Sequence, residues 1–174
     1  MLNKLKTFFV DKKTQLLVCP FITILFIIDI WTKRLAFSMV DYMYNKTAGI
    51  HTYLYVNDYF NIVKVINNGV SFGMFRNLQQ AQIILSFITF CIILFVIYLL
   101  FTTKSKYKIF SYSLIIAGGF GNIYDRIFYG GVFDFLDFHL GKYHWPAFNV
   151  ADSLICIGVF LLLFESIFCR IKKN

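Results

Sequence analysis

The chain of 174 residues has the length of one domain, with 59% hydrophobic and 20% aromatic residues and a mean hydropathy of +0.67. This composition excludes an ordinary soluble protein and indicates a membrane protein. The formal net charge of +8 is explained by membrane topology, so a nucleic-acid partner is not expected.

Four apolar stretches predict four membrane-spanning helices, at about 15–37, 81–101, 109–128 and 150–169. The second is the clearest, because its 21 residues carry no charge and would rise about 31 Å as a helix. Clusters of Lys and Arg precede the first stretch, separate the second from the third and follow the fourth. The positive-inside rule places all three clusters in the cytoplasm. We therefore expect an all-α polytopic membrane protein.

The first stretch also has the basic start of a secretory signal peptide, which would be removed after export. Asp29, Lys33 and Arg34 interrupt its apolar run, and no A-x-A-like cleavage site follows. We therefore expect a retained first span.

Two outer loops are expected, at about 38–80 and 129–149, within a single membrane-embedded domain of residues 1–174. The first loop has β-branched and aromatic residues around Asn68 and Gly69, a pair typical of hairpin turns. It therefore predicts a small extracytoplasmic β element in the first outer loop.

Polar side chains are expected to meet near the outer membrane surface. Asp29 and Lys33 lie roughly 22 Å or more along a first helix that rises from the cytoplasm. Asn122, Asp125 and Arg126 lie about 20–26 Å along the third helix. One interpretation is that Asp29 pairs with Lys33. Asp125 would likewise pair with Arg126, and both ion pairs would hold helix ends at the surface.

Two further carboxylates lie near the same depth. Asp134 comes just before the fourth span and Asp152 lies in its first turn. Once the two ion pairs above are formed, Lys142 is the one remaining Lys or Arg near them in sequence. If the fold brings the two within about 4 Å, their repulsion is about 4 kcal/mol at an effective dielectric constant near 20, and they share one proton. Such a pair supplies the acid and the base of an aspartic protease. Two solvated loop acids are the alternative.

Cysteine and histidine spacing does not predict a metal site. The four cysteines stand alone in apolar stretches and are interpreted as small buried hydrophobic residues. His139 and His144 are five residues apart without an H-E-x-x-H motif, a poor spacing for metal ligands on a helix. We expect neither a metal nor another cofactor.

Five short motifs occur in order along the chain: DIWTK, NNGVSF, GNIYDR, GGVFDF and WPAFNVAD. Together they resemble signal peptidase II, the bacterial lipoprotein signal peptidase, an intramembrane aspartyl protease. The chain departs from the family pattern at Ser71, where alanine is usual, and at Ala117, Gly118 and Gly119, where G-G-A is commoner. Neither departure touches a catalytic position.

The resemblance implies that Asp134 and Asp152 are the catalytic pair and that Asp29 and Lys33 are structural. Five residues would support the site: Asn67, Asn122, Asp125, Arg126 and Asn149. Asp137 is similar to a recurrent acid of the family and is expected to act through other residues at most.

The substrate implied is a bacterial prolipoprotein whose lipobox cysteine carries diacylglycerol. Cleavage would occur just before that cysteine, on the outer side of the cytoplasmic (inner) membrane, with membrane lipids as neighbours. A site in the membrane plane suits this substrate, because its lipid anchor and apolar signal helix hold the scissile bond near one depth. No oligomer is implied.

Two other classes of protein remain open. A proton-coupled transporter would carry acids at several depths, and Glu165, close to the cytoplasmic Arg170, is the only deep candidate. A membrane scaffold without chemistry would need only the ion pairs.

Overall fold

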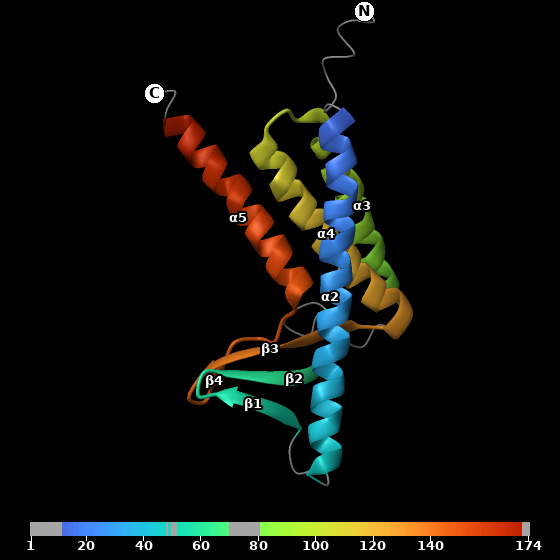
Figure 1. The fold of residues 1–174 in the computed structure, drawn as a ribbon, viewed down its shortest axis with the longest axis vertical. Coiled ribbons are helices and arrows are strands. Elements are labelled where there is room, and N and C mark those ends of the chain that lie inside the picture. Colours follow the sequence, from blue (N-terminus) through green and yellow to red (C-terminus); the bar gives the residue numbers. More distant parts are fainter. Residues whose placement is uncertain (1–11, 48, 50–51, 70–80, 172–174) are drawn as a thin grey trace, which may run out of the picture.

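The chain forms a group of four helices joined to a small antiparallel sheet, as the computed structural model shows for residues 12–47, 49, 52–69 and 81–171 (Figure 1). The start of α2, the end of α5 and the α3–α4 connection lie at one end of the molecule, and the sheet lies at the other. The elements in chain order are α2 (Lys12–Lys46), β1 (Tyr53–Asn57), β2 (Phe60–Asn67), α3 (Ala81–Thr102), α4 (Lys106–Tyr129), β3 (Val132–Leu140), β4 (Tyr143–His144) and α5 (Val150–Ile171).

Helix α4 is the central helix and packs against α2, α3 and α5. Ser105 caps its start by accepting a hydrogen bond from the backbone N–H of Lys108, and Gly130 ends it in the left-handed conformation at φ 71°. A Cβ atom at Gly118 would overlap the carbonyl oxygen of Ala151 on α5. The glycine therefore permits the close α4–α5 packing that brings the start of α5 to the site.

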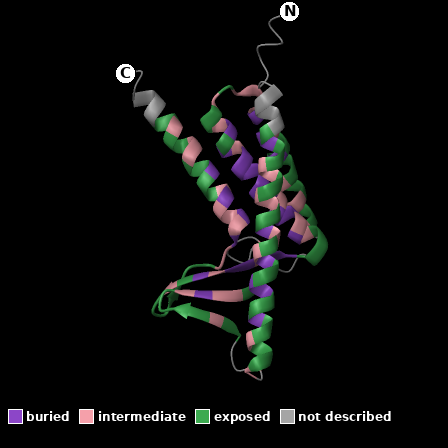
Figure 2. Cartoon of the chain, in the orientation of Figure 1, coloured by how far each residue is buried: buried purple, intermediate pink, exposed green. Residues whose placement is uncertain are grey.

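The helices have an apolar exterior. Two described segments, Gln82–Thr102 of α3 and Val150–Ile167 of α5, have the length and composition to cross a membrane. Large apolar side chains on them are exposed, including Ile83 and Phe160, whereas buried residues concentrate along α4 and at the helix–sheet junction (Figure 2). Such a large exposed apolar surface suits contact with lipid.

The expectation that the cysteines are buried is wrong for the three whose side chains are described. Cys19, Cys91 and Cys156 are exposed, on α2, α3 and α5. The reason is that a membrane protein places apolar residues on its outer face as well as in its core, so an apolar stretch does not by itself indicate burial.

The sheet has the strand order β1-β2-β3-β4, with antiparallel neighbours. The expected β element between the first and second apolar stretches is confirmed, and the sheet also takes two strands, β3 and β4, from residues 129–149. The β1–β2 turn lies at Asp58 and Tyr59, where the Asn57 side chain accepts a hydrogen bond from the Tyr59 backbone N–H at 2.9 Å. The segment that follows Asn68 and Gly69 lies outside the described residues.

Helix α2 continues to Lys46, well past the expected end of the first span near residue 37. Its C-terminal half supports the sheet. Phe37 stacks on Phe133 of β3 with ring centroids 4.4 Å apart, and Asp41 pairs with Lys64 of β2 at 2.8 Å. These contacts fix the sheet, and β3 with it, against the helices.

Candidate active site

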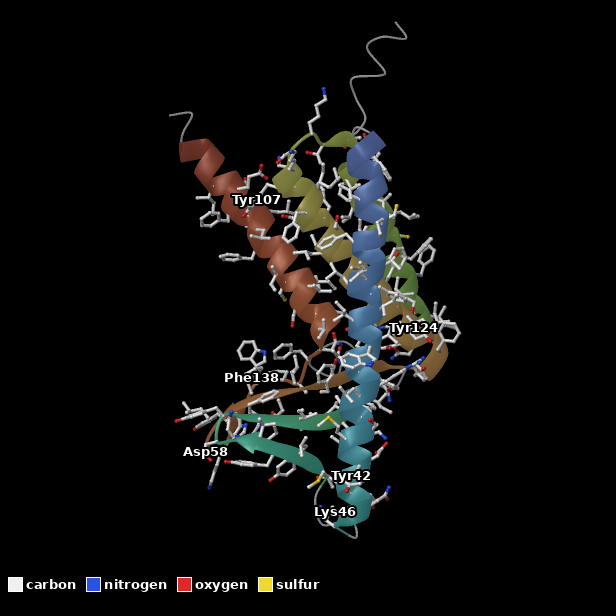
Figure 3. The ribbon with its side chains drawn as sticks, viewed as in Figure 1. Tyr42, Lys46, Asp58, Tyr107, Tyr124 and Phe138 are labelled. Atoms are coloured by element: carbon white, nitrogen blue, oxygen red, sulfur yellow. The ribbon has the colours of Figure 1, made fainter. Side chains whose placement is uncertain are left out.

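Polar side chains from α2, β2, α4, β3 and α5 meet where the helices join the sheet. Figure 3 shows Tyr124 near the sheet-proximal end of α4 and Phe138 on the sheet, on either side of this junction. All nine residues singled out from the sequence lie here. They are joined by the hydrogen bonds, ion pairs and charge interactions described below, so the expected convergence of polar groups is observed.

The start of α5 places Asp152 through a capping box. The Asn149 side-chain oxygen accepts a hydrogen bond from the Asp152 backbone N–H at 2.8 Å, and the Asp152 carboxylate accepts one from the Asn149 backbone N–H at 3.3 Å. This reciprocal pair satisfies two N–H groups that a helix start leaves free. The N-V-A-D sequence therefore determines locally where the Asp152 carboxylate lies.

Asp134 enters from β3 and is 2% exposed. One carboxyl oxygen accepts a hydrogen bond from the side-chain amide of Asn149 at 2.7 Å, and the other accepts one from the amide of Asn67 at 3.1 Å. Asn149 thus bonds to both aspartates at once, through its side chain to Asp134 and through the capping box to Asp152.

Burial raises the pKa of Asp134 to about 6, and repulsion from the Asp152 carboxylate acts in the same direction. The hydrogen bonds from Asn67 and Asn149 partly offset this rise in pKa, because they stabilise the ionised form. Near neutral pH the Asp134 carboxyl therefore exchanges a proton readily, which is the property that general acid–base chemistry requires.

Asn122 of α4 connects this pair to a second charged group. Its amide nitrogen donates to Asp152 at 2.7 Å. Its oxygen accepts hydrogen bonds from Asn149 at 3.3 Å and from the Lys33 ammonium at 3.4 Å.

The second group is centred on Lys33, which is 1% exposed. Its ammonium lies 2.7 Å from Asp29 and 2.8 Å from Asp125. Asp29 also accepts a hydrogen bond from the Ala151 backbone N–H at 2.8 Å, in the first turn of α5, and Asp125 accepts one from the Phe133 N–H at 3.2 Å, at the start of β3. These three charges therefore hold together the two segments that carry Asp152 and Asp134.

The Asp29–Lys33 pair matches the sequence interpretation, but the Asp125–Arg126 pair does not form. Asp125 instead pairs with Lys33 on the neighbouring helix. Consecutive residues on a helix point about 100° apart and do not face each other. One guanidinium nitrogen of Arg126 instead donates to the Asn122 carbonyl at 3.4 Å.

Arg126 is a permanent cation close to Asp134 and Asp152. It is half-buried, and its charge interacts with those of Asp152, Asp134 and Asp125. Its buried Nε–H has no hydrogen-bond partner in the part of the chain that the structure describes. Arg126 therefore keeps a free donor beside the two carboxyl groups.

The sequence interpretation missed one group on the sheet. His139 and His144 were assessed as helix residues, and on a helix a separation of five residues is unfavourable for binding one metal ion. The structure places them on paired strands, directly opposite each other, with Asp137 two residues before His139. Asn61, which belongs to none of the motifs, lies opposite Asp137 on β2.

Comparison with known proteins shows the family of the chain. The sequence profile of the family described as Signal peptidase (SPase) II matches residues 21–168. A lipoprotein signal peptidase of Francisella tularensis subsp. mediasiatica is 37% identical over 149 residues, which cover 83% of this chain and 88% of the relative. One of Thermodesulfovibrio yellowstonii is 47% identical over 109 residues, 63% of this chain and 71% of the relative.

A solved structure described as a bacterial membrane enzyme, determined at 2.3 Å resolution by the in meso method, has a similar fold. It superposes with a TM-score of 0.70 at 28% sequence identity, covering 90% of this chain and 91% of the solved one. The arrangement of helices and sheet is therefore one that a membrane enzyme adopts.

Proposed function

The chain belongs to the signal peptidase II family, and on this premise we propose that it is an aspartic endopeptidase acting on diacylglyceryl-modified prolipoproteins. Membership makes it a membrane protease of lipoprotein processing. The proposal adds the chemistry and the site of cleavage: Asp134 and Asp152 hydrolyse the peptide bond just before the lipidated cysteine.

The observation that carries the proposal is the double contact of Asn149, which bonds to Asp134 through its side chain and to Asp152 through the capping box. Two carboxyl groups held by one residue have a fixed relative orientation. Both groups also accept amide hydrogen bonds, from Asn67 and from Asn122, so neither needs to reorganise during the reaction.

In the proposed mechanism the pair shares one proton, which Asp134 carries because its pKa is raised to about 6. Asp152 takes a proton from water as the water oxygen attacks the carbonyl carbon that precedes the cysteine. Asp134 gives its proton to the cysteine nitrogen as the C–N bond breaks. The Arg126 charge beside the pair favours the negative charge that develops on the attacked oxygen.

The substrate proposal is tested with two synthetic precursors that differ only in the diacylglyceryl group. The lipidated precursor should be cleaved by the detergent-purified protein, and mass spectrometry should find the lipidated cysteine at the new amino terminus. The unlipidated precursor should react far more slowly, because it lacks the anchor that holds the scissile bond at one depth. Equal rates, or cleavage elsewhere, would contradict the proposed specificity.

We also propose that all four helices cross the cytoplasmic membrane, with the site near its outer face and membrane lipids around the helices. Helices α2 and α4 carry charged residues, but Asp29, Lys33 and Asp125 are buried against one another, so these charges do not face the lipid.

A proton-coupled transporter is less well supported as the function of this chain. Its one deep candidate acid, Glu165, accepts a hydrogen bond from Ser105 at the opposite end of α4 from the aspartate pair.

Topology reporters fused after Lys106 and Lys173 are expected to report the cytoplasm, and reporters near Asn57 and Lys142 the outside. The physical reason is that segments rich in Lys and Arg stay inside. An external signal after Lys106 would reverse the orientation and place the aspartate pair on the cytoplasmic side.

The pH profile of cleavage should depend on Asn67. The proton on Asp134 is lost as the pH rises through about 6, so kcat/KM should fall on the alkaline side. The Asn67 hydrogen bond lowers the pKa of Asp134. Replacement of Asn67 by alanine removes this bond, so the alkaline limb of kcat/KM should move to higher pH.

Asn57→Ala is the matched control, because Asn57 lies on β1 and its side-chain oxygen accepts a hydrogen bond from the Tyr59 backbone N–H. This variant should leave the alkaline limb in place. A shift to lower pH in Asn67→Ala, or the same shift in both variants, would show that Asp134 does not carry the proton that limits the reaction.

A further inference from the structure

A second polar group lies on the sheet, formed by Asp137, His139 and His144, here termed the His–Asp cluster. Asp137 and His139 are two residues apart on β3, so their side chains share one face of the strand. His144 of β4 lies directly opposite His139, and their rings stack with centroids 4.8 Å apart and an interplanar angle of 12°. The fold therefore brings three metal-ligating side chains together.

The distances within the cluster are short. One potential ligand atom from each of the three residues lies within 4.8 Å of the others. His144 Nδ1 is 2.8 Å from Asp137 Oδ1. Tetrahedral Zn²⁺ with bonds of about 2.0–2.1 Å needs ligand atoms about 3.3 Å apart. One pair of ligand atoms is closer than this value, but the separation within the cluster extends to 4.8 Å. The exposed His144 ring would therefore have to rotate for all three residues to bind one ion.

Hydrogen bonding alone leaves two features of the cluster unexplained. The first is Asn61, which is 6% exposed. Its amide nitrogen donates to Asp137 at 3.1 Å and lies 3.5 Å from His139 Nδ1, but its buried oxygen has no hydrogen-bond partner among the residues that the structure describes. An unsatisfied buried oxygen costs about 1–3 kcal/mol. Turning the amide over would place this oxygen against the Asp137 carboxylate, so rotation does not remove the problem.

The second feature is the charge of Asp137, which is also 6% exposed. Among the described residues its one ion-pair partner is His144, and no Lys or Arg side chain pairs with it. The aspartates around Lys33 show the contrast, because both contact a buried ammonium. A buried carboxylate normally has a cationic partner or a metal ion.

The cluster faces open space. A cavity of about 700 Å³ is lined by Asn61, Asp137, His139, His144 and Trp145, among other residues. An ion with its water therefore has access to the three side chains of the His–Asp cluster.

We propose that Asp137, His139 and His144 bind a divalent transition-metal ion of the Zn²⁺ type. Two imidazole nitrogens and one carboxylate oxygen are ligands that Zn²⁺ favours. Water would complete the coordination, and the ion would neutralise Asp137, which already accepts a hydrogen bond from the Asn61 amide. The ion would link β3 to β4 and stabilise the sheet. This inference is independent of the proposed hydrolysis by Asp134 and Asp152, which uses no metal.

The test is Zn²⁺ binding to the full chain, purified in detergent with a tag that contains no histidine and then stripped with chelator. Calorimetry should find one Zn²⁺ per chain, and Zn²⁺ should raise the Tm measured by tryptophan fluorescence. His139→Ala and His144→Ala should each weaken binding at least about tenfold and abolish the rise in Tm. Co²⁺ in place of Zn²⁺ should show the absorption of a tetrahedral site with nitrogen and oxygen ligands.

Asp58→Asn is the matched control, because Asp58 is an exposed acid on the same sheet whose carboxylate accepts a hydrogen bond from the Tyr55 hydroxyl. It should bind Zn²⁺ like the parent protein. Cleavage of the lipidated precursor by the two histidine variants shows that they are folded; if His139→Ala is inactive, His139→Gln replaces it. The proposal is overturned if the parent protein does not bind one Zn²⁺ per chain. It is also overturned if a folded histidine variant binds Zn²⁺ as tightly as the parent.

Discussion

Replacing either Asp134 or Asp152 by asparagine is expected to reduce cleavage of the lipidated precursor by at least about 1,000-fold. Asparagine is nearly isosteric with aspartate but neither accepts nor donates the transferred proton. Steady-state kcat/KM, measured with each variant at matched concentration, gives the size of the loss. Abundance in the membrane and elution as a folded species should stay close to those of the parent.

Two other aspartates provide controls for this loss. Asp41 is exposed and pairs with Lys64 on the sheet, so Asp41→Asn should cleave at close to the parental rate. Asp137→Asn should retain measurable activity, because Asp137 bonds to Asn61 and His144 and not to the aspartate pair. Near-parental turnover in Asp134→Asn or Asp152→Asn would remove that residue from the catalytic assignment.

Lys33→Met is expected to destabilise the protein by about 3–5 kcal/mol. The substitution keeps the length of the side chain but leaves Asp29 and Asp125 buried without their common cation. Thermal unfolding in detergent, followed by tryptophan fluorescence, should show a Tm lower by about 10 °C.

The matched control for this variant is Lys64→Met, which removes an ion pair of the same length, 2.8 Å, at a position where both side chains are partly exposed. Exposed pairs contribute about 0–1 kcal/mol, so its Tm should change little. A Lys33→Met protein as stable as the parent would mean that the buried charges do not hold the helices to the sheet.

Much of the site follows from local sequence signals. The N-V-A-D capping box fixes Asp152 within one helical turn, and the i, i+4 spacing of Asp29 and Lys33 fixes their ion pair. Helical rise alone predicts that α2 and α4 carry their polar groups to the same depth. These features depend on residues close together in the chain, so the sequence predicts them.

Features that depend on tertiary packing were not predicted. The partner of Asp125 is Lys33, which is distant in sequence, and Asp125 faces it because α2 packs against α4. The strands of the second outer loop form because β3 pairs with β2, which lies more than sixty residues earlier. Within that loop, the pairing of β3 with β4 places His139 opposite His144.

The prediction of buried cysteines was wrong because hydropathy does not distinguish the core of a membrane protein from its lipid-facing surface. The three described cysteines were expected in the core because they lie in apolar stretches, yet they are exposed on the helices. Hydropathy identifies residues that avoid water, and in lipid these residues occupy both the interior and the outer face. The side of a membrane helix that packs is better indicated by small residues such as Gly118, where α5 approaches α4.

The shared-proton pair is tested most directly by the cleavage rate of the Asp134→Asn, Asp152→Asn double variant, compared with the rates of the two single variants and the parent. Residues that act as one catalytic unit are not additive. Since the two carboxyl groups are proposed to share one proton, the double variant should be no slower than the slower single variant. Losses that multiply in the double variant would show that Asp134 and Asp152 act independently, and would contradict the shared-proton pair.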